Sequence, residues 1–454
     1  MAPQEMVDLG SADARETAKA VRTGIISAQE ACEAAIARIK HFNGPVNAVV
    51  VRDFDRALAA ARQIDASRQP DDPRPLLGVP MTVKESNDVA GLPTTWGMEA
   101  FKDLPIEADA VVVQRLKAAG AIILGKTNAP VALADWQTEN PVYGRTLNPY
   151  DPSRSPGGSS GGSAVALATG MVPLEIGSDI GGSIRVPSHM CGVFGHKPTY
   201  GIVPLRGHGF PGTDGVDVPM AVVGPMARNA GDLVTAMEVI AGPEDGIGYR
   251  LDLPPARHGA LKDFRVLVLD ALPGVAADVE TRTAVSDLAD SLSEAGATVS
   301  DDVSILPRLD TMHSSYVKML NTVITRGTPG AEPMDAHAWM ELLDEQMRVT
   351  RAWRAVFDEH DVVIAPVFST PAFPYQTDPN WANRSLMVDG VPQPYGAQLA
   401  WAGLATFPGL PSTCVPVARS SESLPIGLQL IGAPYGDWTT LALAQLMESA
   451  GLTR

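Results

Sequence analysis

Two stretches of the 454-residue chain combine serine, glycine and lysine in patterns that could support nucleophilic chemistry. Residues 178–185 read SDIGGSIR, with two glycines directly before Ser183. Glycines allow sharp backbone turns in which consecutive amides converge on one point, and an oxyanion hole requires such a turn. The hydroxyl of Ser183 would then lie where it can attack a carbonyl group held by those amides.

A serine hydroxyl needs a base, and no histidine accompanies this motif in the immediate sequence. Lys84 ends the apolar run VPMTV at 79–83, so we expect its side chain to be buried. Burial lowers the pKa of a lysine because it disfavours the charged form, and a neutral lysine can act as a base. Ser159, in the run GGSSGGS at 157–163, could relay a proton between Ser183 and Lys84.

Each of these features also has an ordinary structural explanation. A Gly-Ser run is often a linker, and Asp179 with Arg185 could form an ion pair of no catalytic importance. A single lysine at a strand end usually extends its amine to solvent. The functional interpretation therefore depends on the three features occurring together.

Two other patterns predict different proteins. Residues 120–127, GAIILGKT, match the phosphate-loop pattern, but the apolar run between the glycines reads as a strand and not as a bending loop. Residues 157–161 fit the G-x-S-x-G elbow of α/β-hydrolases, with Ser159 as nucleophile. Such an elbow should follow a buried strand, and three prolines at 149–156 oppose one. An α/β-hydrolase would also need a catalytic histidine further along the chain. The candidates stand in no recognisable motif: His208, His258, His313, His337 and His360.

Composition limits the classes of partner. Acidic residues exceed basic ones, 52 against 35, and the net charge of −17 disfavours nucleic acids and anionic membrane surfaces. The start of the sequence lacks the features of a signal peptide, no apolar run is long enough to span a bilayer, and the three cysteines are widely spaced. We therefore expect a cytoplasmic globular protein without a metal motif.

Periodicity supplies the elements that must position the candidate residues. Helix and strand signals alternate densely enough to predict an α/β sheet. A capping box at 27–30 starts the first clear helix. The helices are expected over 31–39, 54–66, 110–119, 283–295 and from 439, and the strands over 77–84, 121–124, 265–269, 362–365 and 425–431. Residues 144–225, rich in Gly, Ser and Pro, still contain apolar runs and read as closely packed core backbone.

The sequence resembles the amidase signature family. The matching segments are SPGGSSGGS at 155–163, GSDIGGSIRVP at 177–187 and CGVFGHKPT at 191–199, with supporting matches from 27–30 to 424–431. The spacing of 75 residues from Lys84 to Ser159, and of 24 from Ser159 to Ser183, also fits. The resemblance implies one large α/β domain over 1–454, with a central twisted mixed β-sheet covered by helices on both faces. Its parts would be an N-terminal helical segment (1–75), a catalytic core (76–254), a variable region near the site (255–380) and a return to the core sheet (381–454).

The same resemblance implies a role for each site residue. Ser183 would be the nucleophile, Ser159 a relay serine that follows a cis peptide bond, and Lys84 the base. The backbone amides of four residues would form the oxyanion hole: Ile180, Gly181, Gly182 and Ser183. Four residues would support the site by hydrogen bonds: Ser160, Ser178, Asp179 and Arg185. We also expect Trp136 and the segment 316–330, with Thr328 and Gly330, to line the substrate pocket.

The implied activity is cleavage of amide C–N bonds without a metal or organic cofactor. Residues 126–130 and 195–198 look closest to those of bacterial aryl acylamidases and related hydrolases of small aryl carbamates (urethanes), so we expect a small-molecule aryl amide or carbamate substrate. A broad aliphatic amidase or esterase, the glutaminase subunit of a tRNA-dependent amidotransferase, and a non-catalytic subunit of a complex are the alternatives. We expect a monomer or homodimer.

Overall fold

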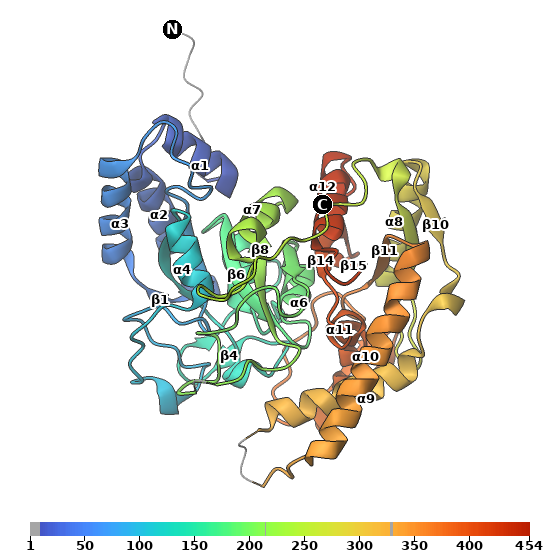
Figure 1. Ribbon diagram of the computed structural model, residues 1–454. Coiled ribbons are helices and arrows are strands. Elements are labelled where there is room, and N and C mark those ends of the chain that lie inside the picture. Colours follow the sequence, from blue (N-terminus) through green and yellow to red (C-terminus); the bar gives the residue numbers. More distant parts are fainter. Residues whose placement is uncertain (1–9, 214, 327–329) are drawn as a thin grey trace.

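The computed structural model describes residues 10–213, 215–326 and 330–454. Within these residues the chain forms twelve α-helices and fifteen β-strands (Figure 1). The helices are α1 (Ala14–Thr23), α2 (Ala28–Val46), α3 (Phe54–Ser67), α4 (Val111–Ala118), α5 (Gly161–Ala168), α6 (Arg185–Cys191), α7 (Ala230–Ile240), α8 (Val279–Glu294), α9 (Leu309–Ile324), α10 (Ala336–Glu359), α11 (Leu399–Thr406) and α12 (Asp437–Ser449). The strands are β1 (Val49–Arg52), β2 (Pro80–Lys84), β3 (Ile122–Thr127), β4 (Glu139–Asn140), β5 (Gly144–Arg145), β6 (Leu174–Asp179), β7 (Phe194–Lys197), β8 (Val222–Ala227), β9 (Arg265–Val268), β10 (Thr298–Ser300), β11 (Val362–Pro366), β12 (Ser385–Val388), β13 (Val391–Pro394), β14 (Ser412–Arg419) and β15 (Pro425–Gly432).

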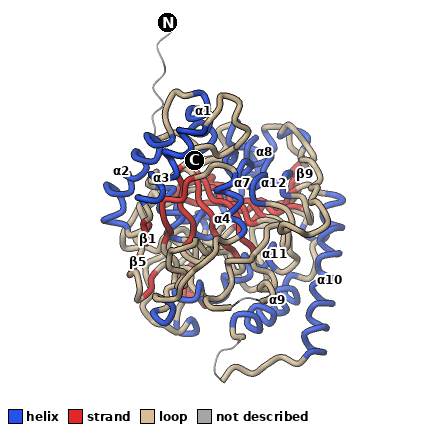
Figure 2. The backbone as a smooth tube through the Cα atoms, turned by 60° about the vertical axis from the view of Figure 1, so that its left-hand side comes forward, coloured by secondary structure: helices blue, strands red, loops and turns tan. Residues whose placement is uncertain are grey.

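One mixed sheet of eleven strands runs through the molecule in the order β1-β3-β2-β6-β8-β7-β14-β15-β11-β9-β10. β2 pairs in parallel with both β3 and β6, whereas β8 pairs antiparallel with β6 and β7. The late strands β14 and β15 lie between β7 and β11, in the middle of the order. Figure 2 shows the strands as a layer with loops gathered along one side of it.

Helices cover both faces of the sheet, as the α/β prediction requires. On one face a single hydrophobic core joins apolar residues of α4, α7, α8 and α12 to alternate residues of the strands, such as Val83, Val266 and Leu430. On the other face, α2, α3 and α5 pack on the first strands, and α9, α10 and α11 pack on the last ones. Successive strand residues point to opposite faces, so Val266 and Leu267 enter different cores.

The predicted elements correspond closely to the observed ones. Ser27 and Glu30 form the expected capping box, in which the Ser27 hydroxyl accepts from the Glu30 amide at 3.0 Å. The glycine-rich stretch at 144–225 is core and not linker, because it contains β6, β7 and the first part of β8, and these strands are buried throughout. The apolar run between Gly120 and Gly125 lies mostly in β3, which disagrees with a phosphate loop.

The helical interpretation of residues 1–75 was incomplete. Its described part also contains β1, which adds an antiparallel edge strand to β3. β1 has only four residues, too few for a clear alternation of apolar and polar side chains to reveal it. In the described part of the chain, no helix combines the length and apolarity needed to cross a membrane.

Candidate active site

Lys84 is the last residue of β2 and is fully buried. Its strand lies between β3 and β6 in the sheet. The Lys84 Nζ atom donates to the Ser159 hydroxyl at 2.6 Å and to the Ser178 hydroxyl at 2.9 Å. The structure therefore brings together the lysine and the serine that the sequence analysis paired across 75 residues.

The surroundings of Lys84 favour its neutral form. Burial lowers the pKa of this amine from 10.5 to about 7, and the charge of Asp179 offsets only part of that effect. Both hydrogen-bond partners are uncharged hydroxyls, so neither holds the amine in its charged form. Near neutral pH a substantial fraction of Lys84 can accept a proton.

Ser159 is the third residue of the run at 157–163 and lies two residues before the start of α5. The peptide bond between Gly158 and Ser159 is cis. No side chain would fit at Gly158, because a Cβ atom there would lie 2.3 Å from the carbonyl oxygen of Asp135. Gly157 has a φ of +81°, which also favours glycine. The run is thus rich in glycine because the backbone is closely packed here.

Ser183 lies in the turn that joins β6 to α6, and it is only 6% exposed. We call residues 180–183 the oxyanion turn, after the role that the sequence analysis predicts for them. Every carbonyl oxygen of this turn accepts a hydrogen bond from the surrounding protein. The donors are the Tyr316 hydroxyl to Ile180 (2.7 Å), the Trp136 indole to Gly181 (2.8 Å), the Val186 amide to Gly182 (2.7 Å) and the Ser160 amide to Ser183 (3.1 Å).

Unlike the carbonyl oxygens of the oxyanion turn, most of its backbone amides have no hydrogen-bond partner among the described residues. The Gly182 amide donates to Oδ1 of Asp179 at 2.9 Å. Within the described residues, the amides of Ile180, Gly181 and Ser183 donate to no protein acceptor. Three of the four expected oxyanion donors are thus available to a ligand, while the fourth is used to fix the turn.

Asp179 and Arg185 form a buried ion pair beneath the turn, with 2.9 Å between Oδ1 and Nη2. Burial alone would raise the pKa of Asp179, but the charge and hydrogen bonds of Arg185 lower it to about 2. Arg185 also donates to the Thr406 hydroxyl at 2.9 Å and to the Gln429 side chain at 2.8 Å. Sequence reasoning missed Thr406 and Gln429, because partners more than 200 residues away leave no spacing signal.

The other two supporting residues, Ser160 and Ser178, connect the run at 157–163 to β6 and the oxyanion turn. The Ser160 amide donates to the Ser183 carbonyl, and its hydroxyl accepts from the Ser178 amide at 3.3 Å. No hydrogen bond in the described part of the chain joins the hydroxyls of Ser159 and Ser183. Catalytic hydrogen bonds are often long without substrate and shorten when it binds.

The structure also tests the α/β-hydrolase alternative. Residues 146–156, before the glycine run, contain no strand, so the elbow lacks its supporting element. Within the described residues, Ser159 hydrogen-bonds to Lys84 and to no histidine. Nor do those residues contain a cluster of three or more His, Cys, Asp or Glu that could hold a metal ion.

The three expected pocket residues have different outcomes. Trp136 is 2% exposed, and its ring packs among Phe368, Trp381 and Tyr395. Its indole donates to the Gly181 carbonyl, so this side chain supports the backbone of the oxyanion turn. Gly330 is exposed, and a Cβ atom added there would meet no described atom within 4 Å. Thr328 lies outside the described residues.

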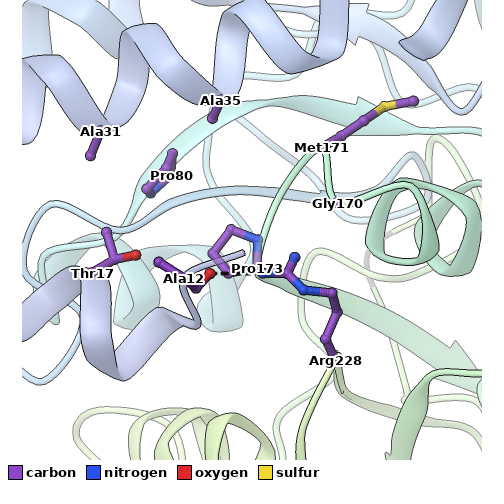
Figure 3. A pocket seen from close by; sticks show the side chains of 9 residues that line it. All are labelled: Ala12, Thr17, Ala31, Ala35, Pro80, Gly170, Met171, Pro173 and Arg228. Carbon is purple, nitrogen blue, oxygen red and sulfur yellow. Dashed lines mark hydrogen bonds between the residues drawn. The ribbon is translucent and has the colours of Figure 1, made fainter. Parts of the chain in front are cut away.

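A small cavity elsewhere is not the substrate site (Figure 3). Its volume is about 20 Å³, enough for one water molecule and too small for an organic substrate. It shares no residue with the site above. The lining residues are Ala12, Thr17, Ala31, Ala35, Pro80, Gly170, Met171, Pro173 and Arg228.

Comparisons with known proteins point to one family. A family model described as Amidase matches residues 30–326 and 317–441. The chain is 33% identical to an indoleacetamide hydrolase of Bradyrhizobium diazoefficiens, over 96% of this chain and 85% of that protein. It is also 33% identical to the 1-carboxybiuret hydrolase subunit AtzE of Pseudomonas sp. strain ADP, over 97% and 98% of the two chains. A solved structure of a bacterial aryl acylamidase of the amidase signature family is similar at 25% identity with a TM-score of 0.81, covering 97% of this chain and 96% of that one.

Proposed function

This chain belongs to the amidase family of C–N bond hydrolases, and from that premise we propose that it cleaves aryl amides and small aryl carbamates through an acyl-enzyme on Ser183. One observation carries the proposal above all others. A fully buried lysine with a lowered pKa lies 2.6 Å from the hydroxyl of Ser159, directly beside the oxyanion turn. A base in that position can activate a serine without histidine.

The proposed reaction begins with two proton transfers. Neutral Lys84 accepts the proton of the Ser159 hydroxyl, and Ser159 accepts the proton of Ser183 as the Ser183 oxygen attacks the substrate carbonyl. The carbonyl π electrons move to oxygen, which becomes the oxyanion of a tetrahedral intermediate. A neutral lysine is essential here, because an ammonium has no lone pair to accept the proton.

We assign the oxyanion hole to the amides of Ile180, Gly181 and Ser183, which have no protein acceptor among the described residues. Gly182 is needed for the shape of the turn, because its φ is +94° and its amide donates to Asp179. We therefore do not assign it as a donor to the substrate. Preorganised donors of this kind stabilise charge that develops only in the transition state, and each contributes about 100-fold or more to the rate.

Collapse of the intermediate breaks the C–N bond. The proton on Lys84 returns through Ser159 to the leaving nitrogen, so the amine departs neutral and the acyl group stays on Ser183. Water then attacks the acyl-enzyme, with the same relay as its base, and restores the Ser183 hydroxyl. An amide gives a carboxylic acid and an amine, whereas a carbamate gives an amine and a carbonic acid half-ester that loses carbon dioxide.

The aryl preference draws support from the relatives. The solved aryl acylamidase is similar over nearly the full chain, and the indoleacetamide hydrolase is named for an amide that carries an aromatic ring.

We further propose a cytoplasmic monomer or homodimer that needs no cofactor and takes small-molecule substrates. Three unpaired, buried cysteines in the described residues support a reducing compartment: Cys32, Cys191 and Cys414.

The test is release of 4-nitroaniline from 4-nitroacetanilide and from ethyl N-(4-nitrophenyl)carbamate by the purified chain. Both substrates have the same leaving group, so their rates compare the acyl groups directly. Ser183→Ala and Lys84→Met should each abolish turnover. Ser188→Ala is the matched control, since among the described residues its buried hydroxyl hydrogen-bonds only to the Ile184 carbonyl, one turn earlier in the chain.

Turnover that survives Ser183→Ala would exclude this nucleophile. Turnover of acetamide or of an ester, with neither aryl substrate cleaved, would move the proposal to the aliphatic branch of the family. Hydrolysis of glutamine only in the presence of a partner protein would point instead to an amidotransferase subunit.

A further inference from the structure

Two side chains outside the proposed triad hold the oxyanion turn from opposite parts of the sequence. The Tyr316 hydroxyl, from α9, donates to the Ile180 carbonyl at 2.7 Å. The Trp136 indole, from the loop after β3, donates to the Gly181 carbonyl at 2.8 Å. Both side chains are almost fully buried, at 0% and 2% exposure, so neither bond competes with bulk water.

The consequence of these bonds follows from the geometry of the peptide group. A trans peptide is planar, and its C=O and N–H point in opposite directions. The Ile180 carbonyl and the Gly181 amide belong to one such plane. By fixing the carbonyl, Tyr316 also fixes the direction of the Gly181 N–H, one of the three amides left free for the oxyanion.

The next peptide plane is held at both ends. Its carbonyl, from Gly181, accepts from Trp136, and its amide, from Gly182, donates to Asp179 at 2.9 Å. Glycine at 181 and 182 would otherwise allow these planes to rotate, since glycine has the fewest backbone restrictions of any residue. External donors therefore supply the rigidity that the sequence of the turn lacks.

Each donor is itself fixed in place. The Tyr316 ring lies against Gly403 of α11, where an added Cβ atom would lie 2.7 Å from Cδ1 of the ring. The residue before Trp136, Asp135, accepts from Arg384 at 2.6 Å and from the Tyr395 hydroxyl at 2.7 Å. The rings of Trp136 and Tyr395 lie 5.1 Å apart.

We propose that Tyr316 and Trp136 are positioning residues for the oxyanion hole, which act by orienting the peptide planes of residues 180–182. This inference rests on the proposed function, because it assumes that the plane held by Tyr316 carries an oxyanion donor, the Gly181 amide. The plane held by Trp136 carries no such donor, and it acts by fixing the two neighbouring planes, which carry the amides of Gly181 and Ser183. Neither residue touches the reacting atoms in this arrangement. Their effect should appear in the rate of the chemical step and not in substrate binding.

The test is Tyr316→Phe, which removes one hydroxyl and keeps the ring. Removal of a whole oxyanion donor costs about 100- to 1,000-fold in kcat, so loss of orientation alone should lower kcat by about tenfold. KM for 4-nitroacetanilide should stay within about twofold, because only transition-state stabilisation is lost. Trp136→Phe should behave in the same way.

Tyr375→Phe is the matched control. Its hydroxyl also donates to a backbone carbonyl, that of Thr146 at 2.7 Å, but it does not contact the oxyanion turn. We expect wild-type kcat and KM for this variant. Thermal unfolding of all three variants separates a rate effect from a loss of folded protein.

A second measurement keeps the inference testable without amide turnover. Fluorophosphonate probes phosphonylate the nucleophilic serine through an intermediate that also places negative charge on oxygen. The labelling rate should fall about tenfold in Tyr316→Phe and stay unchanged in Tyr375→Phe. Labelling that persists in Ser183→Ala would count against the proposed function, whereas equal rates in Tyr316→Phe and wild type would overturn only this inference. A change confined to KM, or a lower melting temperature with unchanged kcat, would overturn it as well.

Discussion

Lys84 shows how far the chemistry of one residue depends on its surroundings. A solvated lysine is almost fully charged at pH 7, whereas burial lowers the pKa of Lys84 to about 7. The proposed reaction uses only the neutral form. Full burial of this one side chain therefore decides whether the site has a base at all.

We predict that kcat/KM for 4-nitroacetanilide rises with pH through about 7 and reaches a plateau above it. Below the pKa, each pH unit should change the rate about tenfold, because the neutral fraction of Lys84 changes by that factor. Initial rates between pH 5 and 9, with protein stability checked at each pH, measure the profile. A rate that is flat or falls over this range would be inconsistent with a neutral lysine base.

Asp179 and Arg185 provide a second prediction at this scale. Asp179→Asn leaves the Arg185 charge buried and unpaired, and such a change costs about 3–5 kcal/mol of folding free energy. Urea denaturation of the variant and the wild type measures the difference. The control is Glu345→Gln, whose ion pair with the exposed Arg348 lies at the surface and should contribute less than about 1 kcal/mol. Equal losses in the two variants would contradict the special role of the buried pair.

The residues of the candidate site could be predicted from the sequence to different degrees. Lys84, Ser159 and Ser183 stand in local patterns, namely an apolar run and two glycine-rich turns, so their types and contexts indicated chemistry before any contact was known. Tyr316 was included only within a segment expected near the pocket, and its hydrogen bond to Ile180 spans 136 residues. The hydrogen bond from Trp136 to Gly181 was not predicted, because an aromatic residue in a loop gives no sign of which backbone group its indole will meet.

At the scale of elements, α11 shows a helix shaped by its neighbour. Gly403 lies inside this eight-residue helix, where glycine is ordinarily less stable than alanine by about 1 kcal/mol. The ring of Tyr316 occupies the space that a side chain would need. Packing of α9 on α11 thus outweighs local helix propensity at this position.

We therefore predict that Gly403→Ala lowers kcat although it improves helix propensity. The new methyl group would press on Tyr316 and draw its hydroxyl away from Ile180. Steady-state kinetics and thermal unfolding measure the two effects. Gly231→Ala in α7 is the control, because its added Cβ meets the end of the half-exposed Arg15 side chain, which can move away. A Gly403→Ala variant with wild-type kcat would contradict the proposed coupling of α9 to the turn.

Element prediction succeeded where periodicity was strong and weakened where it was not. The helix expected over 54–66 matches α3, and the strand expected over 425–431 matches β15. The short strands β4, β5 and β12 were not foreseen, since two to four residues hold too little pattern. The sequence analysis also did not predict the long helices α9 and α10, although their apolar faces pack on the last strands of the sheet.

At the scale of the whole molecule, the net charge of −17 creates a field that acts on any charged substrate. Glycine 4-nitroanilide is cationic at neutral pH, and succinyl 4-nitroanilide is anionic. We predict that the ratio of their kcat/KM values falls as ionic strength rises from about 0.01 to 0.5 M, because screening shortens the Debye length from about 30 Å to a few ångströms. Uncharged 4-nitroacetanilide should change little over the same series. A ratio that is independent of salt would show that the field does not reach the site.

The strand order has a consequence for the synthesis of this protein. β14 and β15 lie in the middle of the sheet, and Gln429 of β15 holds Arg185 beneath the oxyanion turn, 244 residues back in the chain. At about 5–20 residues per second, a ribosome needs roughly 10–50 s to go from one to the other. During that interval the nascent chain carries every proposed catalytic side chain but cannot arrange them, and β7 presents an unpaired edge. The emerging protein should therefore be inactive and in need of protection from aggregation until residues 412–432 leave the exit tunnel.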